Sequence, residues 1–242
     1  MGSKDNIIKL KEELYSAEVI YAWDYEGAGL KYNNLFNWMS SVFIGLLILL
    51  FFWFVSEDIT LNSYSFWAIF TFLTMMVLVS RYLFTPDKHR CYHLTPMGIH
   101  YTEQDMIPEV AYKIARGFAW VGIVVCIIVA FMFGPLAFVG AGAFALMSFG
   151  MTNFQPTVDK SYIFIDERSV VFHIINDGVV SLAIPEKGAY GYIGDIYTQT
   201  LEQKVELLFH LKLLFPEMEM VKIKRLNDQY KHPVYQQDEV AE

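Results

Sequence analysis

The chain has 242 residues, of which 55% are hydrophobic, 17% are aromatic and only 18% are charged. This composition lies outside the usual range for a soluble domain and predicts a membrane protein. The net charge of −8 gives no reason to expect nucleic-acid binding. The two cysteines predict no structural disulfide, because Cys91 falls in a predicted cytoplasmic segment and Cys126 in an apolar one.

Residues 1–31 predict a cytoplasmic amphipathic helix and a linker. In "DNIIKLKEELYSAEVIYAW" the charged residues of both signs lie largely off one apolar stripe, which is formed at helical spacing by Ile7, Leu10, Leu14, Ala17 and Tyr21. The stripe could lie on a bilayer or dock on the cytoplasmic domain. The mixed-sign polar face favours docking, since adsorption to lipid favours Lys and Arg.

Residues 32–84 predict a first transmembrane hairpin. Two uncharged segments, "FNWMSSVFIGLLILLFFWFV" and "LNSYSFWAIFTFLTMMVLVS", are each long enough to cross a hydrocarbon core of about 30 Å as a helix. Neither contains an ionisable residue, and transporters and intramembrane enzymes generally need such residues at depth. The segments therefore predict anchoring rather than chemistry.

Residues 117–153 predict a second transmembrane hairpin. The uncharged run from Gly117 to Val158 is too long for one crossing and is interrupted at Gly134-Pro135. Two full crossings fit it best, and a re-entrant pair of helices is the alternative. Small residues at spacings of about four allow helices to pack closely, within one chain or between the subunits of a homo-oligomer; the candidates are Ala137, Gly140, Ala141 and Ala145.

The basic residues predict the orientation of these hairpins. Of the 18 Lys and Arg residues, four precede the first span, five lie from Arg81 to Arg116 and nine follow the fourth span, and none lies at a hairpin tip. The positive-inside rule therefore predicts that both termini and the middle loop are cytoplasmic. We expect a multi-pass protein of the plasma membrane, of the bacterial inner-membrane type, with membrane lipid as one partner and without a cleaved signal peptide.

The cytoplasmic segments are a β-hairpin and linker over 85–116, an α+β module over 154–226 and a mobile tail over 227–242. In the module, "NDG" at 176–178 predicts a tight turn between two strands. "TLEQKVELLFHLKLLFP" predicts a helix that begins with a capping box from Thr200 to Gln203 and ends before Pro216. A last strand follows in "MEMVKIKRL". Strands followed by a helix favour an antiparallel sheet covered by that helix.

This order of elements resembles the small PH-like domains that are attached to membrane helices in some bacterial proteins. The resemblance rests on strand-turn-strand segments such as "YHLTPMGIHY" and one terminal helix, so it implies a fold and no activity. The predicted fold class is an α-helical polytopic membrane protein, with four transmembrane helices in two hairpins and a small PH-like α+β module with an antiparallel sheet.

The segment "DKHRCYHLTPMGIHY" is the candidate metal site. With a two-residue turn in this hairpin, His93 faces His100 and Cys91 faces Thr102, which gives a three-ligand site of Cys91, His93 and His100. Pro96 and Gly98 favour a three-residue turn instead. That turn moves His100 to the other face of the hairpin. The burial pattern favours the first register and turn chemistry the second. Because the spacing matches no standard zinc pattern, no cofactor is predicted, and a transition metal is the alternative.

The sequence contains no phosphate-binding loop, nucleophile elbow or His-Glu-x-x-His helix. Three tyrosines of the Gly-rich loop and its flank, Tyr190, Tyr192 and Tyr197, form a candidate interaction surface, or else a Tyr-rich sheet edge. The preferred hypothesis is a non-enzymatic membrane accessory or scaffold subunit whose cytoplasmic module binds protein partners in a larger membrane assembly. The alternatives are a metal- or haem-binding sensor or redox protein, and a small channel or carrier.

Overall fold

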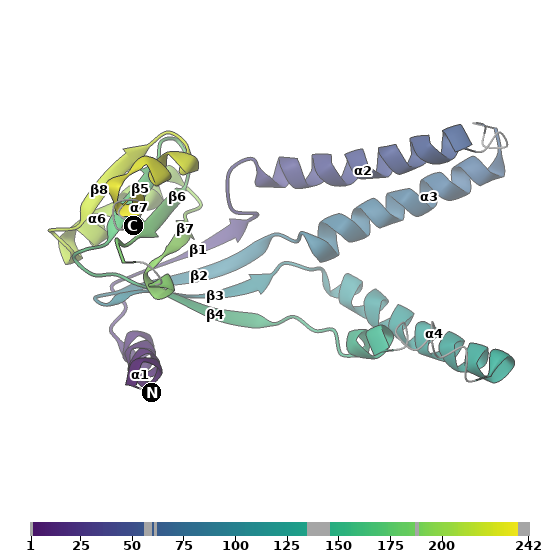
Figure 1. Cartoon of the computed structure of the whole chain (residues 1–242), viewed down its shortest axis with the longest axis horizontal. Helices are drawn as coiled ribbons and strands as arrows, with labels where there is room; N and C mark the ends of the chain where they lie inside the picture. Colours follow the sequence, from purple (N-terminus) through teal and green to yellow (C-terminus); the bar gives the residue numbers. More distant parts are fainter. Residues whose placement is uncertain (1, 56–59, 61, 135–145, 187–188, 237–242) are drawn as a thin grey trace. The chain divides into compact units, whose positions relative to one another are not determined.

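The computed structural model describes the whole chain except residues 1, 56–59, 61, 135–145, 187–188 and 237–242 (Figure 1). Its contacts divide the chain into two compact units that alternate along the sequence. Unit 1 consists of Met1–Phe36, Asp87–Gln104 and Val158–Glu242, and unit 2 of Asn37–Pro86 and Asp105–Thr157. Both units are therefore assembled from segments that lie far apart in the sequence.

The first sheet of unit 1, sheet A, has four antiparallel strands in the order β1-β2-β3-β4 (Figure 1). The strands are β1 Tyr21–Gly27, β2 Lys88–Thr95, β3 Gly98–Asp105 and β4 Val158–Phe164. Trp23 of β1 pairs with Tyr92 of β2, and Ile99 of β3 pairs with Ile163 of β4. Because side chains alternate between the two faces of a strand, these large residues all turn to one face, where they are buried.

The β2–β3 turn decides the register that the sequence left open. Strand β2 ends at Thr95 and β3 begins at Gly98, so the turn has two residues. The Thr95 hydroxyl donates to the Gly98 carbonyl at 2.9 Å and accepts from the Met97 N–H at 3.3 Å. This register keeps Leu94 and Ile99 completely buried. Burial prevailed over turn chemistry, since a slip of one residue would turn the apolar side chains to the other face.

The second sheet of unit 1, sheet B, has the order β7-β6-β5-β8. Its strands are β5 Val170–Ile174, β6 Val179–Ala183, β7 Gly194–Tyr197 and β8 Glu219–Ile223. In the turn between β5 and β6, Asn176 has a φ of 59°, a left-handed conformation that Asn tolerates better than most residues. Strand β8 runs parallel to β5, so the sheet is mixed and not purely antiparallel as predicted.

Helix α6, Leu201–Leu214, covers a core that both sheets share. The Thr200 hydroxyl accepts from the Gln203 N–H at 3.2 Å, which confirms the predicted cap, while the Gln203 side chain accepts from the N–H of Gln199. The buried Lys204 donates to the carbonyls of Ile174 and Asp177 and so ties the helix to the β5–β6 turn. The core contains, among others, Trp23, Tyr92, Leu94, Ile99, Ile163, Val171, Val180, Leu182, Ile196, Leu207 and Leu211.

Helix α1, Gly2–Ser16, packs against sheet A, as the docking alternative predicts. The Tyr15 hydroxyl donates to the Ser161 carbonyl at 3.2 Å, and the Lys11 ammonium lies 5.0 Å from the centroid of the Tyr162 ring. Leu14 is completely buried. The helix is thereby held on the face of the sheet opposite to Tyr92, since Tyr162 alternates with the core residue Ile163.

Glu103 of β3 joins two cations from β2 on the core face of sheet A. Its carboxylate accepts from Arg90 Nε at 2.6 Å and also pairs with Lys88. The Arg90 guanidinium in turn lies 4.7 Å from the centroid of the Tyr197 ring. Burial alone would raise the pKa of Glu103, but the hydrogen bonds and charges of Lys88 and Arg90 outweigh burial and lower it below its ordinary value of 4.5.

Glu103→Gln should therefore reduce stability in a pH-dependent way. A carboxyl group with a lowered folded-state pKa contributes stability above its unfolded-state pKa and loses it as the pH falls through the folded-state value. We expect the free energy of unfolding to fall by about 1–2 kcal/mol at pH 7. The difference from the wild type should vanish as the pH falls through the lowered folded-state pKa of Glu103. Denaturant titrations at several pH values measure this. Glu109→Gln, which alters an exposed carboxylate, should change little at any pH; equal slopes with pH for wild type and Glu103→Gln would contradict the prediction.

Unit 2 contains most of helix α2, Asn33–Val55, with α3, Tyr64–Val79, the π-helical turn η1, Ser80–Phe84, and α4, Glu109–Phe133. Helix α2 packs closely on α3, since a Cβ atom on Gly45 would lie 2.9 Å from the Val77 side chain. The hydroxyls of Ser41 and Ser80 lie 3.3 Å apart. Within unit 2, helix α2 is thus in close contact with α3 and the turn η1 that follows it.

The predicted fold class is wrong. Among the described residues, two four-stranded sheets and their helices form a mixed α/β structure, and only three helices, Asn33–Val55, Tyr64–Phe84 and Glu109–Val129, are long and apolar enough to cross a membrane by length and composition. The sequence interpretation counted uncharged runs and assigned residues 1–31 to a helix and a linker, so it missed β1 and the share of the chain that sheets occupy. The helix-packing candidates Ala137, Gly140, Ala141 and Ala145 lie outside the described residues.

Candidate functional site

The predicted metal ligands are not brought together as one group. The rings of His93 and His100 stack across the β2–β3 hairpin with centroids 4.9 Å apart, and Tyr15 of α1 lies against His100 at 4.8 Å. Burial and the neighbouring His93 lower the pKa of His100. Cys91 instead lies beside His89, with 3.8 Å between Sγ and Nε2. The predicted pairing of the two histidines is present, but Cys91 belongs to a different cluster.

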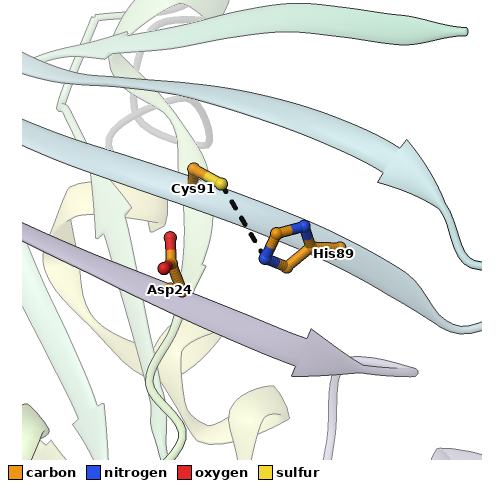
Figure 2. A group of neighbouring side chains, drawn as sticks. All are labelled: Asp24, His89 and Cys91. Atoms are coloured by element: carbon orange, nitrogen blue, oxygen red, sulfur yellow. Dashed lines mark hydrogen bonds between the residues drawn. The ribbon is translucent and has the colours of Figure 1, made fainter.

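That cluster consists of Asp24 from β1 with His89 and Cys91 from β2 (Figure 2). Their ligand-type atoms all lie within 4.8 Å of one another. Burial and the carboxylate of Asp24 raise the pKa of the Cys91 thiol. Asp24 was missed because its segment was expected to be a linker. The alternation of aromatic and polar residues in "YAWDYEG" was the signal that could have predicted a strand there.

The three tyrosines of the candidate interaction surface do not share one surface. Tyr190, in the 3-10 turn η3, Tyr190–Tyr192, is 84% exposed. The Tyr192 ring lies 5.5 Å from that of Phe164, whereas Tyr197 packs against the core of unit 1 and stacks on Tyr25 at 5.3 Å. Tyr190 alone of the three is fully available to a partner.

Helix α6 presents a second apolar face that the sequence interpretation did not separate from the core face. We call it the α6 stripe; it consists of the four residues Leu201, Val205, Phe209 and Leu213. They recur every fourth position and are between 48% and 66% exposed, whereas Leu207 and Leu211 on the other side of the helix are completely buried. The sequence of α6 has apolar residues on both sides of the helix, although only one side can face the core. This pattern could have predicted an exposed apolar face.

Two carboxylates border the α6 stripe. Glu202 and Glu206 line a shallow hollow together with Leu201, Val205 and Phe209. Glu206 accepts a hydrogen bond from the Tyr21 hydroxyl at 3.0 Å, and burial together with this bond raises the pKa of Tyr21 to about 12. One of the two negative charges is thereby held in a defined place. An apolar stripe with an acidic border is suited to bind a protein surface that carries apolar and basic residues.

Comparison with known protein families matches residues 1–242 to the family described as "TsiV2 immunity protein". The chain is 39% identical, over 235 residues that cover 97% of both chains, to "Immunity protein TsiV2" of Vibrio cholerae serotype O1 (strain ATCC 39315 / El Tor Inaba N16961). The chain belongs to the TsiV2 immunity protein family. No solved structure matches it.

Membership of the TsiV2 family corrects the functional description drawn from composition. The family is one of immunity proteins, and the description as a polytopic membrane protein, with its transmembrane and inner-membrane terms, is not supported. The family supports the functional prediction in its coarse form, a role in toxin immunity with a protein as partner. The absence of enzymatic activity and of a cofactor stays a prediction. Binding to lipid, self-association and location stay predictions.

Proposed function

We propose that this chain protects the cell that produces it by binding a cognate toxin protein, and that the α6 stripe is the binding surface. The observation that carries the proposal is the exposure of the α6 stripe in a member of an immunity protein family. Scattered exposed apolar residues are normal on any protein, but a continuous row of large ones on a single helix is typical of interaction sites. The proposed function requires no catalysis and no cofactor.

The position of the α6 stripe supports this assignment. The helix is fixed from its buried side by Leu207 and Leu211, by its Thr200 cap and by Lys204. The exposed side is therefore presented on a rigid support, which lowers the entropy cost of binding. Phe209 is the large aromatic residue of the stripe, and aromatic residues near the centre of an interface often supply most of the binding energy.

The acidic border supports a basic partner. Glu202 and Glu206 lie beside the stripe in a chain of net charge −8, so the surface would attract a positively charged toxin segment and speed its association. Binding should accordingly weaken as the salt concentration rises, because exposed charges are screened.

The test begins with a strain from which the gene for this protein has been deleted. Its cells should be killed in contact with toxin-secreting siblings, and the wild-type gene should restore survival. The cognate toxin is the one whose removal from the siblings abolishes killing. A photoreactive phenylalanine analogue at position 205, in place of Val205, should crosslink to this toxin. The same analogue in place of Tyr230, which is exposed outside α6, should not. Survival of the deletion strain would overturn the function, and crosslinking from position 230 alone would overturn the surface.

A further inference from the structure

The pairing of β1 with β2 places three metal-ligating side chains on one face of sheet A. Asp24 pairs directly with Cys91, and Glu26 pairs with His89, so the three ligands and Glu26 form a two-by-two group across adjacent strands. Figure 2 shows Asp24 on β1 turned toward Cys91 and His89 on β2. None of these side chains contributes to the α6 stripe, so the group is independent of the proposed toxin surface.

The separation between sulfur and nitrogen matches that of a tetrahedral metal site. A zinc ion lies about 2.3 Å from a thiolate and about 2.0–2.1 Å from an imidazole nitrogen, so sulfur and nitrogen ligands at a tetrahedral angle are roughly 3.6 Å apart. Cys91 Sγ and His89 Nε2 are 3.8 Å apart, and the Asp24 carboxylate lies within 4.8 Å of both. The Asp24 carboxylate is therefore the third ligand-type group beside the position that Cys91 and His89 define for an ion.

The strands hold these ligands on a rigid support, and the site is open. The opposite face of β1 and β2 carries Trp23 and Tyr92, which are buried and stacked at 5.0 Å. Ligands supplied by packed strands keep a defined geometry. Asp24 is exposed and His89 and Cys91 are partly exposed, so an ion can enter from solvent. Glu26 Oε1 lies 3.9 Å from His89 Nε2, within reach of an ion bound there.

We propose that Asp24, His89 and Cys91 form a site for a divalent transition metal ion of the zinc class. A mixed set of sulfur, nitrogen and oxygen ligands favours zinc or cobalt over magnesium or calcium, which prefer oxygen alone. On binding, the Cys91 thiol loses its proton to solvent and the thiolate sulfur forms the bond to the metal. Asp24, His89 and Cys91 fill three positions around the ion, and the fourth is left to Glu26 or water.

The test uses the full chain, purified without a histidine tag in mild detergent and stripped with a chelator. Cobalt(II) added to the protein should give the thiolate-to-cobalt charge-transfer band and intense tetrahedral d–d bands at one ion per chain, and zinc should displace it. Cys91→Ser should abolish the charge-transfer band. His89→Ala and Asp24→Asn should each weaken zinc binding by about tenfold or more, since each removes one of three ligands.

Matched variants distinguish this site from the alternatives. Cys126→Ser, which changes the other cysteine, and His93→Ala, which changes the stacked histidine, should bind cobalt as the wild type does. Circular dichroism of each variant shows whether it is folded, and the conservative Asp24→Asn keeps the test decisive if a larger change disrupts β2. Failure of the folded wild type to bind one ion, or equal binding by wild type and Cys91→Ser, would overturn the site. Loss of binding in His93→Ala with retention in Asp24→Asn would replace it by the histidine pair.

Discussion

Replacing Phe209 by glutamate should abolish protection against the cognate toxin without unfolding the protein. The Phe209 ring is 64% exposed on α6, so its loss removes little from the core, and exposed substitutions usually change stability by about 0.5 kcal/mol or less. In a complex the same position would bury a charge against apolar surface. We expect affinity to fall by roughly 30-fold or more, the loss that accompanies an interface hot spot. Isothermal titration of the purified pair and survival of the complemented deletion strain measure it.

Tyr230→Glu is the matched control for this prediction. Tyr230 is an exposed aromatic residue of the same unit, at 58% exposure, and lies in the 3-10 segment η4, Leu226–Lys231, outside α6. Its variant should bind the toxin as the wild type does. If Tyr230→Glu and Phe209→Glu lose affinity equally, the interface is not centred on α6. If neither loses affinity, the α6 stripe is not the binding surface.

Gly98→Ala should destabilise unit 1 by about 2–4 kcal/mol. Gly98 has a φ of 144°, which residues with a side chain rarely adopt, and its Cβ would lie 2.3 Å from the Ile163 carbonyl oxygen. The strained backbone and the clash each cost roughly 1–3 kcal/mol. Because the obstacle is backbone of β4, the residue can be accommodated only by moving a strand of sheet A. Thermal unfolding of the detergent-purified chain, followed by circular dichroism, should show a clearly lowered midpoint.

Gly117→Ala provides the comparison for Gly98→Ala. Gly117 lies within α4, and a Cβ there would meet no described atom within 4 Å. Alanine is favoured over glycine in a helix by about 1 kcal/mol, so this variant should be neutral or slightly stabilised. A similar loss of stability in both variants would show that the positive φ of Gly98 and the clash with the Ile163 carbonyl are not the cause of the effect.

The sequence predicted α6 well because the signals of that helix are local. The Thr200 cap contacts a residue three positions along the chain, and the helix stops just before Pro216. The same local information did not tell which apolar face of α6 is buried. Leu207 and Leu211 meet residues from both sheets, whereas Val205 and Phe209 do not belong to that core. The choice of face depends on where two sheets from distant segments place their side chains.

The candidate metal site shows the same division. The sequence by itself determined that ligand-type residues alternate along residues 87–93, that His93 and His100 could face one another, and that the chain contains long apolar helices. Only the tertiary structure decided that β1 lies beside β2 and brings Asp24 to Cys91, that β8 runs parallel to β5, and that two sheets share one core. Periodicity and capping act over a few residues. Strand pairing joins segments that are distant in the chain, and it is chosen by the burial of the whole core rather than by any one of its segments.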